Sequence, residues 1–79
     1  MRFYFHVRDD LLSEDLEGQE LPTLELARSK AIEGARDLAA EQVRQGTLCL
    51  DHRIDIHDAS NRLLLSVPFR DAVKVAGWP

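Results

Sequence analysis

The chain has 79 residues, of which 44% are hydrophobic and 30% charged, a composition typical of a globular protein and not of a disordered one. One hydrophobic core can form at this length, whereas two domains would each lie near the lower limit for independent folding, so we expect a single domain over residues 1–79. The net charge of −4 and the lack of a Lys/Arg run argue against binding to nucleic acid.

The composition also bears on the compartment. The N-terminal apolar stretch, residues 3–7, is short and contains His6, so it predicts neither a signal peptide nor a membrane span. The single cysteine, Cys49, has no partner within the chain for a disulfide or a cysteine-based zinc site. We therefore expect a cytoplasmic protein that does not associate with membranes.

The first predicted element is a strand over residues 2–8. Its side chains alternate, with Phe3, Phe5 and Val7 expected to face the core, and Tyr4, His6 and Arg8 to face outward. Residues 9–21 are acidic and irregular, and predict a loop that includes a short extra strand at either 11–13 or 19–21, returning beside the first strand. This acidic loop could bind a cation or a basic protein, but it lacks the ligand pattern of a calcium loop, and a solvated loop is the preferred interpretation.

A long amphipathic helix is predicted from Leu24 to Gln45. Thr23 can cap its first turn, and Gly46 can end it. Spacing the residues at 100° places one broad apolar arc toward the core, with small residues at its centre. The arc consists of Leu24, Ala27, Ala31, Ile32, Ala35, Leu38, Ala39 and Val43.

Two more strands are predicted after the helix, at residues 53–58 and 63–69. Both segments alternate, with Ile54, Ile56, Leu63, Leu65, Val67 and Phe69 expected to face inward. The polar residues between them, 59–62, predict a hairpin turn. A short helical turn is expected over residues 70–75, followed by a tail that contains Trp78.

These elements predict an α+β fold with one long helix on one face of a three- to four-stranded, mainly antiparallel sheet. A right-handed crossover through the helix would make the first two strands parallel and place the third between them, in the order 1-3-2. The other face of the sheet then has no cover from within the chain. Its expected side chains form the candidate partner surface: Tyr4, His6, Arg53, Asp55, His57, Leu64 and Ser66.

The segment 51–58 is the richest in residues that bind metals or move protons. His52 and His57 are five residues apart and so lie on opposite faces of a strand. His57 shares a face with Asp55, but in the order 1-3-2 His6 would lie two strands away, roughly 10 Å off. No phosphate loop or nucleophile turn is present either. We therefore predict that the chain is not an enzyme, and assign no catalytic, cofactor-binding or metal-ligating residue.

The class of function that remains is interaction. An uncovered face with Tyr4 and Leu64 near its centre, together with an unpaired sheet edge, favours a homo-oligomer or a protein partner. Tyr4 is the one good outward aromatic residue and Asp55 lies beside it, which disfavours single-stranded nucleic acid. The alternative hypothesis is a small-molecule or metal-binding protein that uses His6, Asp55 and His57.

Three stretches resemble a known family: RFYFHVR at residues 2–8, DLEGQELP at 15–22 and LLLSVPFRDA at 63–72. Together they look like the short bacterial proteins catalogued as a domain of unknown function, and the resemblance spans nearly the whole chain. It implies a bacterial, intracellular protein and a structural role for residues 17–22 at the entry to the helix. The resemblance carries no activity, substrate or cofactor, so it assigns no functional residue.

Overall fold

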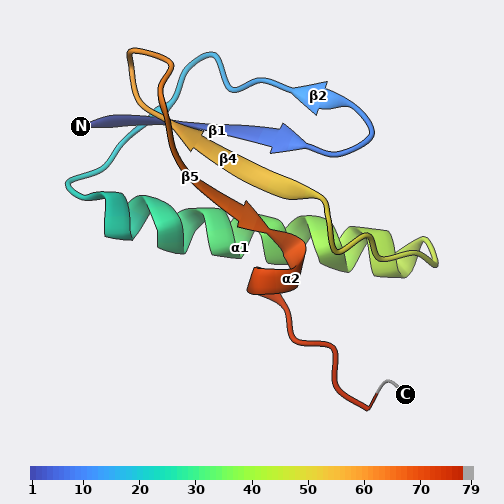
Figure 1. Cartoon of the computed structure of the whole chain (residues 1–79). Coiled ribbons are helices and arrows are strands. Elements are labelled where there is room, and N and C mark those ends of the chain that lie inside the picture. Colours follow the sequence, from blue (N-terminus) through green and yellow to red (C-terminus); the bar gives the residue numbers. More distant parts are fainter. Residues whose placement is uncertain (78–79) are drawn as a thin grey trace.

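The alternating N-terminal segment forms an inner strand of an antiparallel sheet. In the computed structural model, which describes residues 1–77, β1 (Arg2–Arg8) pairs with β4 (Arg53–His57), and β4 pairs with β5 (Leu63–Pro68) (Figure 1). The long helix α1 (Leu24–Arg44) lies along one face of this sheet. The predicted α+β class, with one long helix on an antiparallel sheet, is confirmed.

The acidic segment between β1 and α1 runs back along the edge of β1. Its two short strands, β2 (Leu12–Ser13) and β3 (Gln19–Glu20), pair with opposite ends of β1, so strands form at both of the expected positions. Between them, the Asp15 carboxylate accepts a hydrogen bond from the backbone N–H of Phe5 at 3.1 Å. This edge of β1 is therefore covered along its length by the chain itself.

The predicted strand order 1-3-2 is wrong. The observed order is β2-β1-β4-β5, and β4 runs antiparallel to β1 beside it. The cause is the return of residues 9–21, which brings Leu21 next to Met1, where Leu21 N–H donates to the Met1 carbonyl at 2.9 Å. The helix α1 then starts beside the first residues of β1. It is about 31 Å long, so it brings the chain to the last residues of β1. The chain thus enters β4 beside Arg8 and has to run in the opposite direction.

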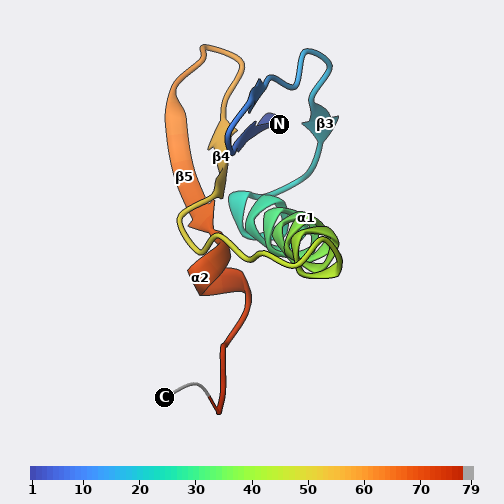
Figure 2. The same ribbon diagram turned by 90° about the vertical axis from the view of Figure 1, so that its right-hand side faces the viewer.

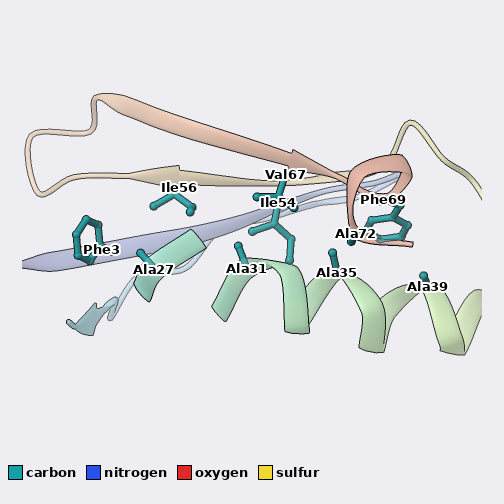
Figure 3. Close-up of a cluster of buried hydrophobic side chains, with 10 residues drawn as sticks. All are labelled: Phe3, Ala27, Ala31, Ala35, Ala39, Ile54, Ile56, Val67, Phe69 and Ala72. Atoms are coloured by element: carbon teal, nitrogen blue, oxygen red, sulfur yellow. The ribbon is translucent and has the colours of Figure 1, made fainter. Parts of the chain in front are cut away.

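The helix has the predicted boundaries to within one residue. Thr23 caps it by accepting the N–H of Leu26 at 3.1 Å, and Gln45 is its C-terminal cap. Its buried face is a stripe of alanines at every fourth position, Ala27, Ala31, Ala35 and Ala39, as the small centre of the predicted arc required (Figure 3). A Cβ atom added at Gly34 would lie 3.2 Å from Cδ1 of Ile54. Helix and sheet therefore approach each other closely.

The core fills the space between the alanine stripe and the sheet. Larger apolar side chains come from the strands and from the short helix α2 (Phe69–Ala72), as Figure 3 shows. The buried hydrophobic residues are Phe3, Ala27, Ala31, Ala35, Ala39, Ile54, Ile56, Val67, Phe69 and Ala72. α2 occupies part of the predicted terminal turn, and Arg36 of α1 holds its end by donating to the Ala72 carbonyl at 2.7 Å. Trp78 lies outside the described residues.

A bulge in the β4–β5 hairpin changes the predicted facing of two leucines. His57 pairs with Leu63 whereas Ile56 pairs with Leu65, which leaves Leu64 as an extra residue on β5. Leu64 consequently packs against the core, and Leu63 is 53% exposed. The assignment of Leu63 to the core and of Leu64 to the outer face was wrong, because a one-residue shift exchanges the two faces.

Candidate functional site

The outer face of the sheet is polar and internally bonded. Of the seven predicted surface residues, Leu64 is turned toward the core, and His6 and Asp55 are buried at 7% and 5% exposure. The other four, Tyr4, Arg53, His57 and Ser66, are at least partly exposed. Because β1 and β4 are neighbours, the face brings its predicted polar residues together more tightly than the order 1-3-2 allowed.

Asp55 is the centre of one group on this face. One carboxylate oxygen accepts from Ser66 Oγ at 2.7 Å and from Arg53 Nε at 3.0 Å, and the other accepts from Arg8 Nε at 3.3 Å. Burial by itself raises the pKa of this carboxyl, but the donors from Ser66, Arg53 and Arg8 outweigh it and hold the pKa below its usual value. One carboxylate thus lies between two guanidinium groups, which leaves a net positive charge there.

His6 is paired with Asp55 across the strands and held in one tautomer. The backbone N–H of Asp15 donates to its Nδ1 at 3.0 Å, so in the neutral ring the proton sits on Nε2. Desolvation by burial lowers the pKa of His6, and the nearby His57 and Arg8 lower it further, whereas Glu14 and Asp15 oppose the shift. The imidazole of His6 is therefore a neutral hydrogen-bond donor.

His57 is held in the opposite tautomer. Its Nδ1 lies 3.0 Å from the amide oxygen of Asn61, which only accepts, so Nδ1 carries a proton and, in the neutral ring, Nε2 has a lone pair with no partner among the described residues. The two imidazole rings meet edge to face, with their centroids 4.6 Å apart. The estimate of roughly 10 Å between these histidines was wrong, because it placed a strand between them.

The two histidines open into a cleft of about 360 Å³ on the outer face. Loop residues 14–16 form one wall and the β4–β5 turn forms the other. The lining consists of Tyr4, His6, Arg8, Glu14, Asp15, Leu16, His57, Asp58, Ala59 and Asn61. We call this the histidine cleft.

The histidine cleft is not arranged as a metal site. Within residues 1–77, no three His, Cys, Asp or Glu side chains are grouped so as to hold a metal ion. His6 has one ring nitrogen engaged with Asp15 N–H and a proton on the other, so neither is a free ligand. Asp55 has all its bonds to Ser66 and the two arginines. The geometry thus gives no support to the metal version of the alternative hypothesis.

Asp15 is an organising residue that the sequence analysis did not single out. Its side chain accepts from the backbone N–H groups of Phe5, Glu17 and Gly18, and its own N–H fixes the tautomer of His6. These bonds lower the pKa of its carboxyl despite the opposing effect of burial. The sequence signal that could have identified Asp15 is its position three residues before a glycine, because aspartates at such positions often close turns. In the structure, Gly18 has a φ of 71°.

The second candidate feature is the free edge of the sheet. β5 pairs on one side with β4 and, among the described residues, has no strand on its other side (Figure 2). None of its six residues is charged. Phe69 N–H points toward β4, since it donates to the His52 carbonyl at 2.8 Å. Because backbone groups alternate along the strand, the N–H and C=O of Ser66 point away from β4, toward the free edge of the sheet.

The comparisons with known proteins place the chain in a family. None of the curated proteins and none of the solved structures matches it. No helix within residues 1–77 combines the length and the apolar character needed to cross a membrane. A family model described as a domain of unknown function, DUF6894, matches residues 2–70 and so spans all strands of the sheet and the long helix. The chain belongs to the DUF6894 family.

Proposed function

We propose that this protein is an interaction module that self-associates by pairing β5 with β5 of a second copy. The observation that carries the proposal is the uncharged, unpaired edge of β5, in contrast to the edge of β1, which the chain covers with β2, β3 and Asp15. Sheet edges that are not meant to pair usually carry charges or are covered. Antiparallel pairing of β5 with β5 of the second copy would join the β2-β1-β4-β5 sheets of the two copies into one continuous sheet.

The ends of β5 are compatible with this pairing. Arg62 and Arg70 flank the strand, and each has a carboxylate partner in its own chain, Asp58 and Asp51 respectively. Their charges therefore oppose the approach of a second copy less than free arginines would. Pro68 lies at the end of β5 with its ring nitrogen on the free side, so it limits the pairing segment to the residues around Ser66.

The edge supports self-association better than the outer face does. Leu64, which was expected to be an apolar contact on that face, packs on the core, and Asp55 and His6 are already bonded within the chain. We also propose that the module acts in the bacterial cytoplasm. Support for this setting comes from the free thiol of Cys49, which is half-buried and suits a reducing compartment.

The test is a pair of substitutions at Ser66. Ser66→Pro removes the N–H that points to the free edge together with the hydroxyl bond to Asp55, and leaves the backbone hydrogen bonds to β4 in place. Ser66→Ala is its matched control, because it keeps the N–H and removes only the hydroxyl bond to Asp55. A two-fold pair loses two N–H donors with Ser66→Pro. At a net ~1 kcal/mol per hydrogen bond, the dimer should weaken by roughly 30-fold. Sedimentation equilibrium across micromolar concentrations measures this.

We expect dimerisation in the parent protein and in Ser66→Ala, and monomers in Ser66→Pro. Leu63→Lys is the second variant, because it places a charge beside the edge at an exposed position and leaves the core unchanged. A parent protein that stays monomeric at all concentrations, or a dimer that both Ser66→Pro and Leu63→Lys leave intact, would refute the proposed edge pairing.

A further inference from the structure

The floor of the histidine cleft offers one donor and one acceptor side by side. Nδ1 of His6 is occupied by Asp15 N–H, and its Nε2–H has no hydrogen-bond partner among the described residues. In residues 1–77, every fully enclosed side-chain nitrogen or oxygen has a partner, so Nε2 of this buried residue reaches the cleft. The neighbouring His57, in its neutral form, contributes the lone pair of its own Nε2.

Arg8 places a positive charge in the lining of the same cleft. Its Nε is bonded to Asp55, and the two terminal nitrogens of its guanidinium have no partner within the described residues. Arg8 and His6 are two residues apart on β1 and therefore project from the same side of the strand. The neutral Nε2–H of His6 and the positively charged terminal N–H groups of Arg8 therefore lie on the same side of the cleft.

Two of the three acidic residues that line the cleft, Asp15 and Asp58, accept hydrogen bonds from backbone N–H groups. Asp15 accepts three backbone N–H groups, and Asp58 Oδ1 accepts the N–H groups of Ser60 and Arg62. Glu14 is exposed, where its charge is screened by solvent and salt. The unpaired groups of the two histidines and Arg8 are therefore N–H donors beside one acceptor, which suits a ligand that has both an accepting and a donating oxygen.

We propose that the histidine cleft binds a small monoanionic hydroxycarboxylate. Its carboxylate accepts from His6 Nε2–H and from the terminal N–H groups of Arg8, and its hydroxyl donates to His57 Nε2. Each end of the ligand matches a group that the fold leaves unpaired in the cleft. Asp15 and Asn61 are positioning residues, because each fixes the tautomer of one histidine. This binding site is separate from the β5 edge and does not depend on self-association.

Asparagine substitutions separate the roles of the two histidines. In His6→Asn, the side-chain oxygen can still accept Asp15 N–H but the Nε2 donor is lost. In His57→Asn, the amide can still donate to Asn61 but the Nε2 acceptor is lost. His52→Asn is the matched control, since His52 lies outside the cleft and its Nδ1 likewise contacts a side chain, that of Gln42, at 2.6 Å.

The experiment is titration of the full chain with glycolate, acetate and inorganic phosphate, followed through backbone amide signals in two-dimensional NMR. We expect saturable glycolate binding that shifts the Asp15 amide signal, with weaker binding of acetate and phosphate. Loss of a charge-assisted hydrogen bond should weaken glycolate binding by about tenfold or more in His6→Asn. His57→Asn should lose the preference for glycolate over acetate, and His52→Asn should behave as the parent does.

Several results would overturn the assignment. They are the absence of saturable glycolate binding, equal affinity in His6→Asn and the parent protein, and phosphate binding as tight as that of glycolate. Saturable binding of zinc that removes the signals of both cleft histidines would replace the proposal with a metal site. Because the amide spectrum also reports whether each variant is folded, a failure to fold is distinguished from a loss of binding.

Discussion

At the scale of single residues, His6 links the fold to pH. Its folded-state pKa lies below the ordinary imidazole value of 6.5, because burial and the neighbouring His57 and Arg8 disfavour the charged ring. Protonation therefore favours the unfolded chain. The stabilising contribution is complete above pH 6.5 and is lost as the pH falls through the folded-state pKa. We expect the free energy of unfolding, measured with urea, to fall below pH 6.5 by up to about 1.4 kcal/mol per pH unit.

Two asparagine substitutions, one at His6 and one at His52, test the origin of this pH dependence. His6→Asn removes the titrating group and should flatten the profile between pH 6.5 and 5, whereas His52→Asn should not. Asp15 and Asp55 have lowered pKa values, so their contributions are lost only as the pH falls below 3.8. An unchanged slope in His6→Asn would show that another group governs stability in this range.

At the scale of the element, α1 depends on the small size of its buried face. Ala35 is fully buried against the sheet, and Ala40 is exposed on the same helix. Ala35→Leu forces extra methyl groups into a packed layer and should lower the free energy of unfolding by about 1–3 kcal/mol. Ala40→Leu changes the same residue type where there is room, so urea denaturation should show little effect. Equal losses of unfolding free energy at both positions would mean that the close packing of the helix on the sheet does not restrict the size of the side chain at position 35.

At the scale of the whole molecule, self-association and stability are linked. A dimer formed by folded chains stabilises them by mass action, so the melting temperature should rise with protein concentration. Ser66→Pro should abolish that rise, because it removes the outward donor at the β5 edge, whereas Ser66→Ala should retain it. Differential scanning calorimetry at several concentrations measures the effect. A melting temperature that does not depend on concentration in the parent protein would contradict the dimer.

Much of the fold followed from local signals. The alternation in residues 2–8, the hairpin around Asn61 and the capping of the helix by Thr23 are each decided by a few neighbouring residues, and all were predicted. The histidine cleft was predicted only in part. His6, Asp55 and His57 were placed on one face, but the contact between the two histidines and the part played by Asp15 were not foreseen.

By itself, the sequence determined which residues form the helix and strands, because periodicity, caps and turn residues act over a few positions. Only the tertiary structure decided how the strands are ordered. The return of residues 9–21 along β1 places the start of α1 beside Met1, and that path makes β4 the antiparallel neighbour of β1. The bulge that exchanges Leu63 and Leu64 arises from pairing between strands, which no single segment encodes. The cleft and the free β5 edge are consequences of that order, so they appear only when the chain is folded.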